Sequence, residues 1–122
     1  MLKINPNISI FVQLAEHLRI EIFSGALKPG DKILSIREMA VELEVNPNTI
    51  KRVYQELSDD GLIVTQGTLG NYVTEDTELI KNKKAFFLIH KTSEFVNLLQ
   101  AVDADVDQVI KKYKGDNDGK ND

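Results

Sequence analysis

The sequence contains no cysteine, no long apolar run and no sign of a secretion signal. Without cysteine, disulfides and thiolate metal sites are excluded. No apolar segment approaches the ~18 residues that a membrane span requires, and no signal peptide opens the chain. We therefore expect a cytoplasmic protein with no membrane partner. The 122 residues allow one small domain with an appendage and a modest core.

The chain also lacks the residue sets on which catalysis usually depends. Neither His17 nor His90 stands near a nucleophile or a ligand set, and no Gly-rich phosphate loop is present. We interpret His17 as a surface histidine and His90 as a core histidine that packs or hydrogen-bonds. The segment from Asp103 to Asp107 begins like a calcium loop, but the required glycine and glutamate are missing. The sequence predicts no enzyme, no cofactor and no metal site.

An excess of positive charge is missing as well, because the formal net charge is −4. Residues 1–74 hold 7 Lys and Arg against 9 Asp and Glu, and the remainder holds 8 against 10. Any contact with nucleic acid must therefore depend on local placement of charge, with weak non-specific binding. The acidic total favours an alternative, a module that binds another protein without reading DNA directly.

What the sequence does contain is a pattern of two short helices joined by a tight turn, in residues 35–61. Ser35 followed by Glu38 forms a capping box, which starts the first helix. Asn46 can cap the second helix, and Pro47 suits its first position. A spacing of i, i+3, i+4, i+7 predicts the buried face of the second helix, namely Ile50, Val53, Tyr54 and Leu57.

The outward face of that second helix carries side chains that suit DNA. Asn and Gln can pair with adenine, Arg and Lys can reach guanine or phosphate, and the Thr methyl can contact thymine. Two such helices form a helix-turn-helix, although a helical hairpin with a solvated polar face remains the alternative. The outward residues are Asn48, Thr49, Lys51, Arg52 and Gln55.

Residues 10–73 contain the phrase KILSIREMAVELEVNPNTIKRVYQELSDDGLI, preceded by SGALKPGDKI and followed by GNYV. This run resembles the signature of the GntR family of regulators, and the short C-terminal region is most similar to the YtrA-like subfamily. The resemblance implies a winged helix-turn-helix domain in residues 1–74. It also implies sequence-specific regulation of transcription, more often repression, through a double-stranded DNA operator.

Carried over position by position, the resemblance implies a set of DNA contacts in the helix-turn-helix and in the wing. Arg52 and Gln55 are added from helical geometry alone. The wing is predicted as a hairpin with strands at residues 62–64 and 71–73. The contacts implied by the family are Arg37, Asn46, Asn48, Thr49, Lys51, Gln66 and Gly67.

Three positions depart from the family pattern. Leu34 replaces a proline before the capping serine, and Glu44 stands in the turn where glycine is usual. If Glu44 has a positive φ, it costs roughly 1 kcal/mol there. Gly67 stands at or near the place of an arginine at the wing tip, so the wing is expected to contribute less.

The segment before the helix-turn-helix is predicted to hold one helix and one short strand. The helix should run from Ile10 to Ser24 and end at Gly25. The strand should comprise residues 32–34. Spacing predicts the buried stripe of the helix, which consists of Phe11, Leu14, Ala15, Leu18 and Ile22.

Residues 75–114 are predicted to form a two-helix dimerisation region. A long helix over residues 78–102 has more apolar surface than one small domain can cover. Asp105 and Gln108 form a capping box for a last helix, whose buried face would be Val106, Val109, Ile110 and Tyr113. The predicted dimer interface comprises Phe86, Phe87, Leu88, Ile89, Phe95 and Leu99.

The end of the chain, residues 115–122, is polar and predicted to be disordered. Only 48 residues follow Thr74, too few for an effector domain of ~100–150 residues. Any small-molecule effector would therefore bind at the dimer interface or between the domains. The fold class predicted is mainly α with a small β-hairpin: a winged helix-turn-helix and a C-terminal two-helix appendage.

Overall fold

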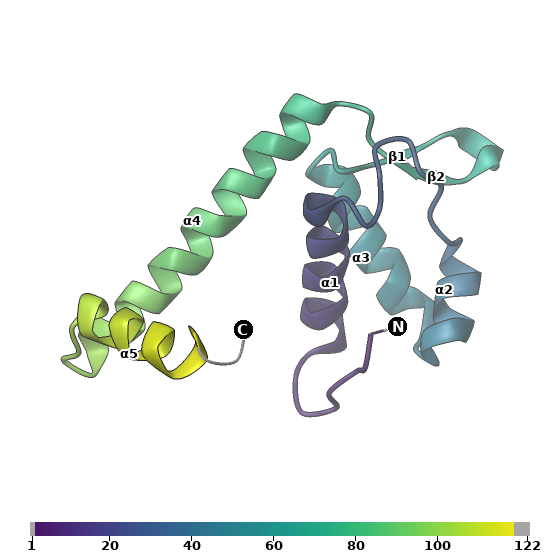
Figure 1. Cartoon of the computed structure of the whole chain (residues 1–122). Helices are drawn as coiled ribbons and strands as arrows, with labels where there is room; N and C mark the ends of the chain where they lie inside the picture. Colours follow the sequence, from purple (N-terminus) through teal and green to yellow (C-terminus); the bar gives the residue numbers. More distant parts are fainter. Residues whose placement is uncertain (1, 119–122) are drawn as a thin grey trace. The chain divides into compact units, whose positions relative to one another are not determined.

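The computed structural model describes residues 2–118, and within them the chain forms five α-helices and one two-stranded antiparallel sheet (Figure 1). The chain divides into two compact units, with the boundary between Lys84 and Ala85. The first unit holds helices α1 to α3 and the hairpin. The second holds most of α4 and all of α5. The predicted fold class is confirmed.

Helix α1 spans Ile10–Ser24, as the sequence predicted. The Ser9 hydroxyl caps it by accepting from the Val12 N–H, and Gly25 ends it in the left-handed conformation with φ 85°. Leu14, Ala15, Leu18 and Ile22 are buried, whereas Phe11 is half-buried. The stripe read from the spacing is therefore the face that enters the core.

Helices α2 (Ile36–Leu43) and α3 (Pro47–Asp59) form the helix-turn-helix. Both bonds of the capping box are present, because Glu38 N donates to Ser35 Oγ at 3.1 Å and Ser35 N donates to Glu38 Oε1 at 2.9 Å. Glu44 ends α2 with φ 56°, so it has the left-handed backbone that favours glycine. The predicted buried face of α3 is confirmed, with Ile50, Val53, Tyr54 and Leu57 at most 4% exposed.

Strands β1 (Ile63–Thr65) and β2 (Asn71–Val73) form the wing, joined by the short 3₁₀ helix η1 (Gly67–Leu69). Ile63 pairs with Val73, and Thr65 pairs with Asn71. The hairpin prediction is correct, although its first strand begins one residue late, because Leu62 N donates back to Leu57 O of α3.

The predicted strand at residues 32–34 is wrong. This segment makes one isolated bridge, between Lys32 and Tyr72. Ile33 N donates to Asn71 O of β2 at 3.0 Å, and just before the segment Asp31 O accepts from Val73 N and Gly30 N donates to Val73 O. The chain must turn at once into α2, so no longer ladder can form.

The core of the first unit is formed where α1, α2, α3 and the hairpin meet. Arg19 of α1 adds an electrostatic link, because its Nη2 lies 3.1 Å from both Glu56 Oε2 and Asp60 Oδ2. The start of α4 also belongs here, since Leu79 and Ile80 pack against the core. The first unit therefore extends about ten residues beyond the predicted boundary at residue 74.

Helix α4 spans Thr77–Ala101 and α5 spans Val106–Asp118. The Asp105 carboxylate accepts from Gln108 N at 3.1 Å and so caps α5. The prediction that residues 115–118 are disordered is wrong. No proline interrupts α5, and Asn117 Nδ2 donates to Tyr113 O at 2.8 Å within its last turn. The rest of the predicted tail, residues 119–122, lies outside the described residues.

The capping box gives a pH-dependent contribution to stability. The Ser35 N–H donating to the Glu38 carboxylate holds the pKa of Glu38 below its ordinary value of 4.5. Because the pKa of Glu38 is lower in the folded protein, the ionised carboxylate stabilises the fold above pH 4.5. This contribution is lost as the pH falls through the pKa that Glu38 has in the folded protein. We expect the stability difference between the parent and Glu38→Gln to shrink below pH 4.5.

Urea unfolding of both proteins between neutral and acid pH measures this difference. Glu42→Gln is the matched control, because Glu42 is exposed on the same helix and takes no part in the cap. A difference between parent and Glu38→Gln that stays constant over the whole pH range would contradict the assignment.

Candidate nucleic-acid interface

The first turn of α3 presents a polar surface because its apolar side chains are turned inward. Ile50 and Val53 are fully buried. The same helical spacing leaves Asn48 and Lys51 exposed and Thr49 half-buried. Asn46 stands just before them, and its Oδ1 accepts from Asn48 N at 2.8 Å as the N-cap of α3. These four predicted contacts therefore lie together at one end of the helix.

Two cations of the helix-turn-helix are available to bind phosphate. Arg37 is exposed in the first turn of α2, and Lys51 is exposed on α3. Within residues 2–118 neither side chain takes part in an ion pair. An unpaired cation can neutralise a phosphate without first giving up a carboxylate partner.

Arg52 and Gln55, the two residues added from helical geometry alone, have partners within the chain. The Arg52 guanidinium lies 3.9 Å from the centroid of the Phe11 ring. Gln55 Nε2 donates to Asp59 Oδ1 at 2.9 Å. Arg52 still lies beside Asn48 in a surface hollow between α1 and α3. Gln55 is the weaker candidate, because the adjacent carboxylate repels a phosphate.

Acidic side chains at the far end of α3 are held away from its first turn. Arg19 pairs with Glu56 and Asp60, and Gln55 binds Asp59. These contacts direct three carboxylates of an acidic chain toward protein partners. Arg19 therefore partly offsets the charges of Glu56 and Asp60, whereas Asp59, bound by a neutral amide, keeps its full charge.

The wing presents backbone and amide groups at its tip and a cation at its base. Gln66 and Gly67 are exposed, and Gly67 has φ 53°, which favours glycine. Lys32 lies along the wing, since a Cβ on Gly70 would approach Lys32 Cε to 3.0 Å. No sequence pattern marks Lys32 as a candidate contact, and its position follows from this approach to Gly70 and from its bridge to Tyr72.

Each of the two histidines contacts a glutamate of its own helix. His17 Nε2 pairs with the Glu21 carboxylate and is half-buried. The prediction of a core position for His90 is wrong, because its side chain is 64% exposed and pairs with Glu94 at 3.1 Å. Among residues 2–118 no group of three or more His, Cys, Asp or Glu could hold a metal ion. In the same residues no helix is long and apolar enough to cross a bilayer.

A helix-turn-helix, a hairpin directly after its second helix and exposed amides on that helix's first turn define a winged-helix DNA-binding protein. The sequence model of "Bacterial regulatory proteins, gntR family" matches residues 11–73. The chain therefore belongs to the GntR family, and it is a DNA-binding transcriptional regulator. The predicted resemblance is confirmed.

Relatives of similar length support the short YtrA-like type. The uncharacterized HTH-type transcriptional regulator YhcF of Bacillus subtilis is 30% identical over 105 residues, which cover 86% of this chain and 87% of that protein. The HTH-type transcriptional repressor YtrA of Bacillus subtilis is 37% identical over 87 residues, 68% of this chain and 67% of that protein. A GntR family transcriptional regulator from Listeria monocytogenes has a solved structure with TM-score 0.83 and 32% identity, covering 92% of this chain and 98% of that chain.

Proposed function

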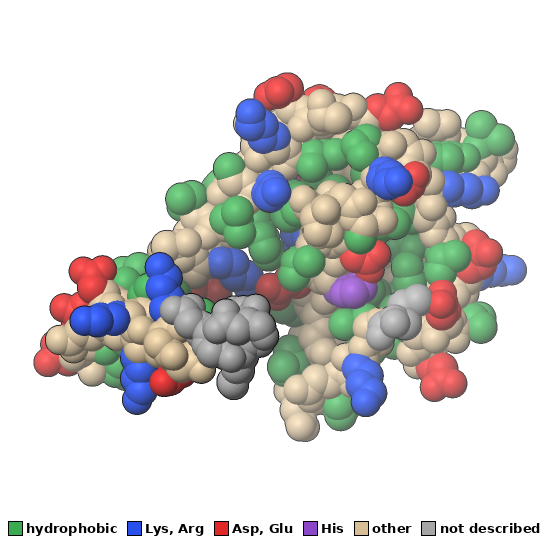
Figure 2. Space-filling view, in the orientation of Figure 1, with side chains coloured by type: hydrophobic (Ala, Val, Ile, Leu, Met, Phe, Trp, Pro, Cys, Tyr) green, Lys and Arg blue, Asp and Glu red, His purple; other side chains and the backbone are tan. Residues whose placement is uncertain are grey.

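We propose that the protein binds a palindromic operator as a homodimer and represses transcription. One observation supports the dimer: exposed large hydrophobic residues are more frequent along the second unit than along the first. Among residues 2–118, nine of the fifteen exposed large hydrophobic residues lie beyond residue 84, although that segment is less than a third of the chain. Hydrophobic side chains are visible at the surface of α4 (Figure 2). The nine are Phe86, Leu88, Ile89, Phe95, Leu98, Val102, Val106, Ile110 and Tyr113.

Two members of the predicted interface need revision. Leu99 is only 6% exposed within the single chain, so it stabilises the chain itself and is not available to a partner. Phe87 is half-buried and lies under the Lys91 ammonium at 5.6 Å. Phe86 and Ile89, by contrast, are 72% and 70% exposed. A second copy of the chain, related by a two-fold axis, would cover this surface.

The dimer also accounts for how an acidic protein could hold DNA. Two recognition helices set roughly 34 Å apart would read two half-sites one turn of DNA apart. We propose contacts from Arg37, Asn46, Asn48, Thr49 and Lys51, with Arg52, Gln66 and Gly67 beside them. Repression rests on the name of the relative YtrA. The regulator would act in the cytoplasm and without catalysis, in keeping with relatives named as transcriptional regulators.

An electrophoretic shift and footprint on DNA upstream of the protein's own gene test this proposal. We expect a protected palindrome at low salt and a much weaker complex with random DNA. The alternative, a winged-helix module that binds protein alone, predicts equally weak binding to both DNAs. That outcome would overturn the proposal.

Lys51 should set part of the salt dependence of binding. Each phosphate contact contributes about one unit to the slope of log K against log salt concentration. We expect a modest slope for the parent, since few cations face the DNA, and a slope lower by about one unit per half-site for Lys51→Ala. Fluorescence anisotropy over a salt series gives both values.

Lys28→Ala is the matched control for this measurement, because Lys28 is an exposed lysine outside the helix-turn-helix. Its slope should equal that of the parent. A steep parent slope that Lys51→Ala leaves unchanged would place the phosphate contacts elsewhere.

A further inference from the structure

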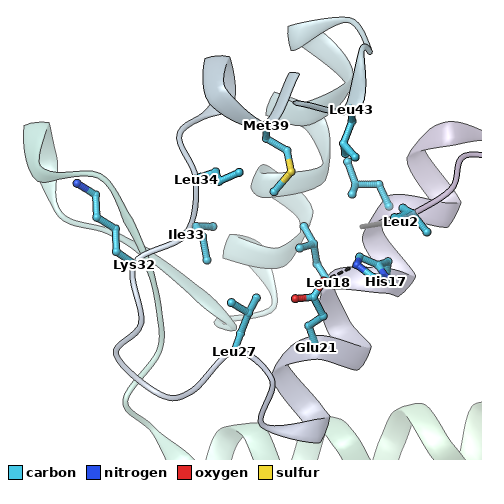
Figure 3. Close-up of a pocket in the computed structure, with 11 residues that line it drawn as sticks. Leu2, His17, Leu18, Glu21, Leu27, Lys32, Ile33, Leu34, Met39 and Leu43 are labelled. Atoms are coloured by element: carbon cyan, nitrogen blue, oxygen red, sulfur yellow. Dashed lines mark ion pairs between the residues drawn. The ribbon is translucent and has the colours of Figure 1, made fainter. Parts of the chain in front are cut away.

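The first unit contains a partly open, mainly apolar cavity of about 190 Å³, whose lining shares only Lys32 with the candidate DNA interface. It lies between α1, α2 and the segment that follows α1, and all of its walls belong to the first unit (Figure 3). Leu14 and Leu18 line it from α1, while Met39 and Leu43 line it from α2. The remaining apolar walls are Leu2, Leu27, Ile33 and Leu34.

The size and lining of the cavity favour a small neutral ligand. Eight of the eleven lining residues are apolar. A water molecule needs two to four polar partners, and an apolar cavity of roughly 150 Å³ stays dry and accepts benzene. The present cavity is somewhat larger. It would therefore accommodate an aromatic or branched aliphatic molecule of about ten non-hydrogen atoms.

The three polar lining residues argue against an anionic ligand. His17 and Glu21 pair with each other, and their side chains are 30% and 32% exposed, so they stand at the rim. The Lys32 ammonium extends away from the other lining side chains in Figure 3, toward Gly70 of the wing. With no unpaired cation directed inward, a carboxylate would be buried without compensation. A single hydroxyl or ring N–H can instead bond at the rim with Glu21.

The walls of the cavity are connected to both helices of the helix-turn-helix. The Leu34 side chain lines the cavity, while its carbonyl oxygen accepts from the Tyr54 hydroxyl of α3 at 2.7 Å. Met39 lines it from α2, the helix that carries Arg37 at its start. A ligand that displaces Leu34 or Met39 would therefore change how α2 and α3 are held together.

We propose that this cavity is an effector site for a small, neutral, mainly apolar molecule, and that its occupation weakens DNA binding. This departs from the sequence-based expectation of an effector at the dimer interface or between the domains. The second part of this proposal, that the ligand weakens DNA binding, rests on the proposed function. The first part, ligand binding itself, does not require DNA and is measured without it.

Ligand binding is tested on the full chain by methyl NMR with indole as the probe. We expect saturable shifts at Leu18, Leu27 and Met39, with a dissociation constant on the order of 0.1 mM. Leu27→Phe fills the cavity and should weaken indole binding by at least about tenfold. Ile20→Phe is the matched control, because Ile20 is an exposed residue of α1 outside the cavity, and its affinity should equal that of the parent.

A second variant keeps the test decisive where Leu27→Phe does not fold. Leu27→Ala enlarges the cavity and should raise the affinity for naphthalene by about tenfold or more over the parent. The absence of saturable shifts up to about 5 mM indole would overturn the proposal. Equal indole affinity in the parent and a folded Leu27→Phe would do the same, because the ligand would then bind elsewhere.

The regulatory half is tested by anisotropy on the operator fragment with and without saturating indole. We expect operator affinity to fall at least about fivefold for the parent and to stay unchanged for Leu27→Phe. Indole binding with no change in operator affinity would overturn this half. Failure to bind the operator even without indole would contradict the proposed function and leave the NMR result standing.

Discussion

Phe86→Glu combined with Ile89→Glu should convert the protein to a monomer that binds its palindromic operator about 10²–10⁴-fold more weakly. Both side chains are more than two-thirds exposed in the single chain, so their replacement removes no core contact. In a dimer each would place a carboxylate in an apolar interface, where an unpaired charge is strongly unfavourable. The second half-site contact would then no longer be intramolecular.

Sedimentation at micromolar concentration and operator titration measure the two effects together. Ile20→Glu is the control, since it introduces a carboxylate at an exposed apolar residue of the first unit. It should remain dimeric and retain affinity. The double variant should still bind an isolated half-site as the parent monomer does. A monomeric double variant with full operator affinity would show that α4 does not supply the dimer contact.

The Asn48→Ala variant should lose about 1–3 kcal/mol of binding free energy on the operator and little on random DNA. Asn48 is exposed in the first turn of α3, the part of a recognition helix that reaches base edges. Its backbone N–H is already satisfied by Asn46 Oδ1, so the substitution leaves the N-cap in place. The loss should therefore reflect the missing amide and not a disordered helix.

Gln55→Ala is the comparison for Asn48→Ala on the same helix. Gln55 has the same type of amide, but it donates to Asp59 and stands beside that carboxylate. We expect a smaller loss on the operator for this variant. Competition titrations with operator and random DNA separate the two effects. Equal losses on both DNAs for Asn48→Ala would mean that the residue positions the protein without reading bases.

Lys32 illustrates a part of the candidate site that the sequence could not reveal. It lies outside the helix-turn-helix and 38 residues before Gly70, yet its side chain lies along the wing. The position of Arg52 over Phe11 is a second example, because it joins the start of α1 to the middle of α3. Neither contact follows a fixed spacing along the chain, so no periodicity could predict it.

Local physical rules determined most of the helical framework from the sequence alone. Caps at Ser35 and Asn46 and the 3.6-residue period of apolar side chains fixed where α1, α2 and α3 lie and which faces are buried. These rules involve residues at most a few positions apart. They also placed Asn48 and Lys51 outward, because the inward positions of α3 were already taken.

Only the tertiary structure decided which apolar residues are covered and which charges are paired. The sequence assigned Leu99 to a dimer interface, but the folded chain buries it, while Phe86 on the same helix stays exposed. Arg19 pairs with Glu56, 37 residues away, and thereby reduces the acidity near α3. Such contacts depend on how whole helices pack against one another. That packing is decided by contacts between residues that are distant in sequence.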